Sequence, residues 1–202
     1  MDSTTAIALE LENFEADYKR LLKQSFSKGV DLRVEDFLYL SAINRTIDIA
    51  NGFSHALAAQ NLSVLAVLIR VQINTLATLN YLETSERRGD ILRAFNQGVE
   101  FRRMAIPGKK EKLIEKVLID KAKETYAWIA AAYSSTSSWV HLSPTSTYSL
   151  LEIGDDDVVT LRTPRVLDEK YQPAVEELCE CMAACLRGIL NHIRVWASSP
   201  RS

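Results

Sequence analysis

Apolar side chains recur at helical spacing through most of the chain, and this periodicity predicts helices rather than strands. The predicted helices cover residues 4–26, 35–59, 62–84, 91–104, 111–132 and 168–197. The helix at 62–84 is apolar on nearly every side, so we expect it to be the central helix. Only the Gln60-Asn61 turn separates it from the helix before it, which predicts an antiparallel helical hairpin.

A different pattern precedes the last helix. Residues 148–153 and 158–162 are rich in β-branched and apolar side chains, and they flank Gly154 and the aspartates at 155–157. Two such runs about a Gly/Asp turn predict a β-hairpin at about 147–163. The predicted fold class is therefore mainly α: a single-domain helical bundle over residues 1–202, built around the helical hairpin, with one β-hairpin inserted before the last helix.

Composition supports this fold and narrows the function. Only 7 glycines and 5 prolines in 202 residues favour long helices over a turn-rich β fold. The net charge of −2 gives no global attraction to nucleic acid or membrane. Binding of nucleic acid would need a local basic patch, and the basic residues that could form one gather between positions 87 and 112 (Arg87, Arg88, Arg93, Arg102, Arg103, Lys109, Lys110 and Lys112).

Three features predict a cytoplasmic protein without a membrane association. The first 20 residues are acidic and amphipathic, unlike a signal peptide. The apolar helix at 62–84 carries Arg70, Gln72 and Asn74, a polar load that lipid-spanning helices rarely carry. All three cysteines lie within seven residues of one predicted helix, which argues against disulfides and for a reducing compartment.

Polar residues form a line along each helix of the predicted hairpin. Arg70, Asn74 and Tyr81 share one line at i, i+4 and i+11. The neighbouring helix carries a second line, made of Asn44, Asp48, Asn51 and His55. Across a hairpin that turns at residue 60, Asp48 or Asn51 would lie opposite Arg70. This arrangement is typical both of a buried ion pair that fixes the register of two helices and of a functional cleft, and both interpretations stay open.

A second candidate is the segment Ser138-Trp-Val-His141-Leu-Ser143. His141 stands at a predicted helix end, among hydroxyl groups and before Pro144. A histidine in such a place can act as a general acid or base near neutral pH. The structural alternative is that Ser138 and His141 cap the preceding helix.

The last helix offers a third candidate, Arg187 and His192. Five residues separate them, so they point about 140° apart on an ideal helix. His192 lies beside Cys181 and Cys185, but three ligands from one helix without a fourth do not make a closed zinc site. The chain also has no glycine-rich phosphate loop. We therefore expect no metal and no cofactor.

The run Leu-Ile-Arg70-Val-Gln-Ile-Asn74, followed much later by Tyr133 and Ser138-Trp-Val-His141-Leu-Ser143, resembles uncharacterised bacterial helical domains. Those domains are similar to the HEPN-like superfamily (higher eukaryotes and prokaryotes nucleotide-binding), which includes abortive-infection and toxin proteins. The resemblance covers roughly residues 35–145. Two departures stand out: Asn74 replaces a glutamate of the closer families, and Gly188 follows Arg187 where active HEPN ribonucleases have a polar residue.

The resemblance implies a dimeric helical bundle of a bacterial defence or toxin–antitoxin system that cleaves RNA without a metal. Its catalytic residues would be Arg70, His141 and Ser138 or, as a second choice, Arg187 and His192. The implied binding residues are Asn74, Asp48, Tyr81, Tyr133 and Ser143. Expected partners are a second copy of the chain and RNA or a protein of the same system. Two alternatives remain, a non-catalytic adaptor or regulatory module and a bundle that binds a nucleotide or small molecule.

Overall fold

The computed structural model describes residues 3–26, 31–105, 112–140, 151–153, 159–161 and 171–199. The described chain is mainly helical, as predicted. Its helices are α1 (Ser3–Ser25), α2 (Val34–Ala58), α3 (Leu62–Thr84), α4 (Arg88–Asn96), the 3₁₀ turn η1 (Phe101–Arg103), α5 (Glu115–Ala122), α6 (Ile129–Val140) and α8 (Gln172–Ser198).

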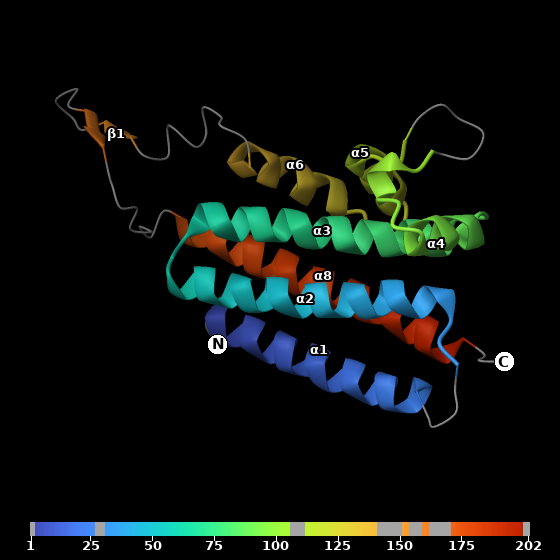
Figure 1. Cartoon of the computed structure of the whole chain (residues 1–202). Helices are drawn as coiled ribbons and strands as arrows, with labels where there is room; N and C mark the ends of the chain where they lie inside the picture. The colour runs from blue at the N-terminus through green and yellow to red at the C-terminus, as the bar shows by residue number, and fades with distance from the viewer. Residues whose placement is uncertain are drawn as a thin grey trace.

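Helix α3 is the central element. α2 runs along one side of it, α5 and α6 cover the opposite side, and α8 lies behind α2 and α3 (Figure 1). α1 packs on α2 and α8. Leu65, Ile69, Ile73 and Leu76 of α3 are completely buried. Within the described residues α3 alone is long and apolar enough to cross a membrane, and 56% of its most apolar stretch is buried against the rest of the protein. Such burial is what a core helix shows.

The predicted helical hairpin is confirmed, and its turn has a clear cause. α2 ends at Ala58 and α3 begins at Leu62. Gln60 adopts a left-handed backbone conformation (φ 53°), which stops α2. The side chain of Asn61 then accepts a hydrogen bond from the backbone N–H of Val64 (3.2 Å) and so caps the start of α3.

The single helix predicted at 91–104 is wrong. α4 begins earlier, at Arg88, and ends at Asn96. Gly98 follows with a φ of +82°, a conformation that only glycine adopts readily and that reverses the chain after the helix. The rest of the predicted helix contains only η1.

The single helix predicted at 111–132 is also wrong, because turns at residues 123–128 separate α5 from α6. α6 instead continues through the Ser/Thr cluster to Val140. The hydroxyls of Thr136 and Ser137 bond back to the carbonyls of Ala132 (2.7 Å) and Tyr133 (2.8 Å). This back-bonding lets small polar residues remain inside a helix.

Two short strands precede α8. β1 (Leu151–Ile153) pairs antiparallel with β2 (Val159–Leu161), with Glu152 opposite Thr160. The residues on both sides of each strand lie outside the described part of the chain. The β-hairpin over about 147–163 therefore stays a prediction.

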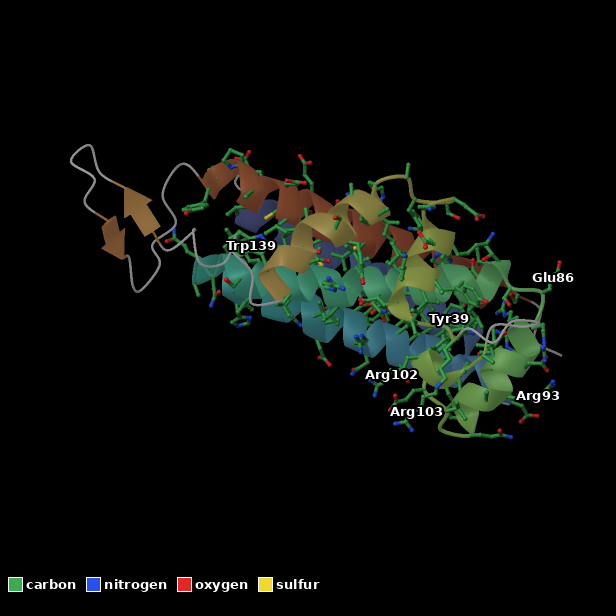
Figure 2. All side chains as sticks on the ribbon, turned by 90° about the horizontal axis from the view of Figure 1, so that it is seen from above. Tyr39, Glu86, Arg93, Arg102, Arg103 and Trp139 are labelled. Carbon is green, nitrogen blue, oxygen red and sulfur yellow. The ribbon has the colours of Figure 1, made fainter. Side chains whose placement is uncertain are left out.

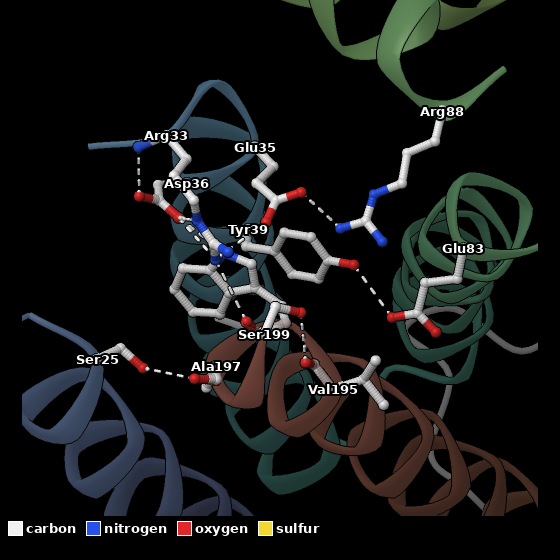
Figure 3. A network of polar contacts seen from close by, with 11 residues as sticks. Ser25, Arg33, Glu35, Asp36, Tyr39, Glu83, Arg88, Val195, Ala197 and Ser199 are labelled. Carbon is white, nitrogen blue, oxygen red and sulfur yellow. Dashed lines mark hydrogen bonds and ion pairs between the residues drawn. The ribbon is translucent and has the colours of Figure 1, made fainter. Parts of the chain in front are cut away.

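A polar cluster holds the end of the bundle where α2 begins and where α3 and α8 end (Figure 3). The buried carboxylate of Asp36 accepts hydrogen bonds from the indole Nε1 of Trp196 (2.8 Å) and from the backbone N–H of Arg33 (2.7 Å). The ring of Tyr39 stacks on Trp196 with 5.1 Å between centroids, and its hydroxyl donates to Glu83 (3.1 Å). These contacts fix the relative positions of the three helix ends.

Candidate functional site

Arg70 extends from the middle of α3 toward α5 and α6. Its Nη2 donates to the carboxylate Oε2 of Glu115 (3.0 Å) and to the hydroxyl of Tyr133, and its Nη1 donates to the hydroxyl of Ser137. The guanidinium carbon lies 4.1 Å from the centre of the Tyr133 ring. We call these four residues the Arg70 centre. Only 13% of the Arg70 side chain is exposed, so the centre joins three helices around a mostly buried charge.

The electrostatics of the Arg70 centre are nearly balanced. The Tyr133 hydroxyl also donates to Glu115 (2.9 Å). Burial, followed by the hydrogen bond to Glu115 and its negative charge, raises the pKa of Tyr133, so the phenol stays protonated and remains a donor. Glu115 in turn neutralises Arg70. The guanidinium is therefore held in one orientation by groups from α5 and α6.

The predicted pairing of Arg70 with Asp48 is wrong. Asp48 is exposed on α2, where it accepts a hydrogen bond from the side chain of Asn44 (3.1 Å). The α2 residue that points toward α3 is Arg45 instead. Its Nε donates to the hydroxyl of Thr75 of α3 (3.1 Å). Asn51 and His55 are exposed as well, so the polar line on α2 faces away from the core.

Two adjoining hollows between α2 and α3 form what we call the polar furrow; they share Arg45 and Val71. The smaller hollow has a volume of about 220 Å³, the larger about 670 Å³. The smaller is lined by Arg45, Val67, Arg70, Val71, Asn74 and Glu115. The larger is lined by Leu40, Ser41, Asn44, Arg45, Asp48, Ile49 and Val71. The furrow thus brings together three predicted site residues, Arg70, Asn74 and Asp48.

The smaller hollow has the chemistry of an anion site. It presents two guanidinium groups and an amide against the single carboxylate of Glu115. The contacts described above engage three of the five N–H groups of Arg70 and the Nε of Arg45. The two Nη groups of Arg45, which these contacts do not engage, keep the planar fork that matches the oxygens of a phosphate.

The other residues of the first predicted site are not all placed at the furrow. Tyr133 belongs to the Arg70 centre. Tyr81 lies 11 residues farther along α3, about 16 Å from Arg70 along the helix axis, so it is outside the furrow. His141, Ser143 and the side chain of Ser138 lie outside the described residues.

The second predicted pair, Arg187 and His192, is not brought together in one cleft. Arg187 is 59% exposed and donates to Glu10 of α1 (2.7 Å). His192 is buried: its Nδ1 lies 2.7 Å from Glu83 Oε2, and its Nε2 lies 2.9 Å from the hydroxyl of Tyr126. His192 therefore belongs to the core. Among the described side chains, no group of three or more His, Cys, Asp or Glu is arranged to hold a metal ion.

The five arginines between positions 87 and 103 all take part in ion pairs, that of Arg88 being with Glu35 of α2. Arg87 and Arg93 both pair with Asp90, and Arg102 and Arg103 both pair with Glu100. Figure 2 shows Arg93, Arg102 and Arg103 near the α4 end of the molecule. Each of these three arginines shares its carboxylate with a second arginine, so four arginines face two carboxylates and this surface keeps a net positive charge.

Three residues of the site were missed by sequence reasoning: Arg45, Glu115 and Ser137. A buried arginine on an apolar helix predicts an acidic partner, but 26 aspartates and glutamates gave no means of choosing Glu115. No sequence pattern singled out Arg45, because it lies beside the predicted polar line of its helix and not on it.

Comparison of the chain with protein-family profiles, with curated proteins and with solved structures finds no match.

Proposed function

We propose that the chain is a HEPN-like helical protein of a bacterial defence or toxin–antitoxin system, and that it binds RNA and cleaves it without a metal. The observation that carries the proposal is the place of Arg70, held by α5 and α6 at the edge of a furrow that also presents Arg45 and Asn74. A site pre-arranged in this way suits a phosphate that gains charge during a reaction. The proposal includes a homodimer in the cytoplasm and a β-hairpin at about 147–163 beside the His141 segment.

In the proposed reaction His141 accepts the proton of a ribose 2′-hydroxyl. The O2′–P bond forms and the P–O5′ bond breaks, leaving a 2′,3′-cyclic phosphate. The departing O5′ takes up a proton, which a protonated histidine can supply. Arg70 stabilises the additional negative charge on the phosphorus-bound oxygens. His141 follows Ser137, a contact of Arg70, by four residues, and Ser138 would add a hydrogen-bonding hydroxyl.

The test is cleavage of labelled RNAs of varied sequence by purified protein in EDTA. We expect His141→Ala to slow cleavage about 100-fold to 10,000-fold, the usual contribution of general acid–base catalysis. His55→Ala is the matched control, because His55 is exposed on α2 and its Nδ1 bonds only to the carbonyl of Asn51 (2.7 Å) among the described contacts. The proposal fails if clean wild-type protein cuts none of the RNAs. It also fails if His141→Ala keeps full activity while Arg187→Ala loses it.

A second candidate is a non-catalytic interaction module. One observation favours it: Glu115 neutralises Arg70, and the arginine is only 13% exposed. In that case the Arg70 centre serves only to hold α3, α5 and α6 together. Substitutions in the polar furrow then leave RNA binding unchanged.

A further inference from the structure

A long groove lies on the face of the bundle formed by α1, α8 and the start of α6, separate from the polar furrow. Its volume is about 880 Å³, larger than that of either hollow of the polar furrow. Small residues line much of it, including Ala6 of α1, Ala131 and Ala132 of α6, and Ala184 of α8. Side chains this small let another helix approach the groove closely.

Apolar surface is exposed in this groove. Leu9 of α1 lines it with 46% of its surface accessible, and Ala131 is also exposed. Trp128 and Cys181 line it and are partly accessible. An apolar lining that remains accessible within a polar surface is typical of a binding site.

The rim of the groove is acidic. Glu176, Glu177 and Glu180 stand along α8, and Glu10 of α1 lines the groove farther along, beside Arg187. Arg187 is the single cation among the groove residues, and it is paired with Glu10 at 2.7 Å. The three α8 carboxylates therefore leave the rim with a net negative charge.

We propose that this groove binds an amphipathic helix of another protein, with alanine or leucine on its apolar face and lysine or arginine on its flanks. The apolar face would lie on the alanines, and the flanking cations would meet the carboxylates of α8. In helix-in-groove binding of this kind, apolar side chains one turn apart on the bound helix contact the groove. Charge complementarity would then select a basic partner over an acidic one.

The acidic rim argues against a second copy of the chain as the occupant. A symmetric dimer through this face would bring the acidic side chains of both copies into one interface. Like charges at an interface oppose association. A basic helix from a different protein meets no such repulsion.

The experiment measures binding of a fluorescent peptide of about five helical turns, made of leucine, alanine and lysine in amphipathic order, to the full chain. The double variant Glu176→Lys with Glu180→Lys is expected to weaken binding roughly tenfold or more. The matched control is Glu86→Lys with Glu124→Lys, which makes the same change in net charge at exposed positions outside the groove. We expect the control to change affinity no more than about twofold, because distant charges are screened.

Two further measurements separate the alternatives. Ala131→Gln, which fills the groove without changing its charge, should also weaken binding, whereas Ala58→Gln, at an exposed position of α2 outside the groove, should not. The proposal is overturned if a peptide with glutamate in place of lysine binds equally well, or if both double variants bind alike. It is also overturned if the wild-type chain is a dimer that Ala131→Gln dissociates, because the groove would then belong to a second copy.

Discussion

Arg70→Lys is expected to slow RNA cleavage about 100-fold or more while the bundle stays folded. Lysine keeps the positive charge but presents a single ammonium in place of a planar fork. It cannot at once bond Glu115 and Ser137, lie over the Tyr133 ring, and present further N–H groups to a phosphate. The measurements are initial cleavage rates in EDTA and the free energy of unfolding in urea.

Arg20→Lys is the control for this exchange. Arg20 is exposed on α1 and pairs with Asp17 of the same helix (2.7 Å), and it lines none of the described hollows. We expect its cleavage rate and stability to match the wild type. A folded Arg70→Lys protein that cuts RNA at the wild-type rate would remove Arg70 from the proposed chemistry and favour the interaction module.

His192→Ala is expected to lower the free energy of unfolding by about 3 kcal/mol, because it removes one partner from each of two partly buried polar groups. The variant would deprive the Glu83 carboxylate and the Tyr126 hydroxyl of the imidazole that lies within 3 Å of each. It would also leave a cavity in the core where α8 faces α3. Urea denaturation followed by circular dichroism measures the effect.

Arg187→Ala provides the comparison on the same helix. Arg187 is 59% exposed, and exposed ion pairs contribute only about 0–1 kcal/mol. We therefore expect the two substitutions, five residues apart, to differ severalfold in their effect on stability. Equal and small effects would contradict the core position of His192.

The long helices could be predicted because their apolar spacing is strong. Predicted bounds for the first three helices agree with α1, α2 and α3 to within one residue at each end. The Gln60-Asn61 turn was readable for the same reason, since polar residues interrupt two long apolar patterns. Periodicity of this length outweighs weak local preferences.

The shorter helices could not be predicted from periodicity. The apolar spacing continues through 111–132, but turns at 123–128 interrupt the helix, and there Tyr126 contacts His192 of α8. His192 is 66 residues away in sequence, so no local pattern contains this contact. The Ser/Thr cluster had the opposite effect: it did not predict the helix α6 that contains it. Hydroxyl groups can favour a loop, and they can also bond back to carbonyls within a helix.

The importance of Arg70 was predictable, but its partner was not. An arginine on an apolar helix predicts a buried polar centre wherever the fold places it. The choice of Asp48 failed because Asp48 and Arg45 differ by about 60° around the axis of α2, and apolar spacing does not fix helix rotation that finely. The carboxylate came instead from Glu115, on a short helix 45 residues away in sequence.

The most direct test of the proposed function compares a synthetic RNA with the DNA of the same sequence, each incubated with the purified chain in EDTA. If the 2′-hydroxyl is the nucleophile, the RNA is cut to products with 2′,3′-cyclic phosphate and 5′-hydroxyl ends, and the DNA stays intact. Cleavage of both molecules, or of neither by protein that is folded and pure, would contradict the account.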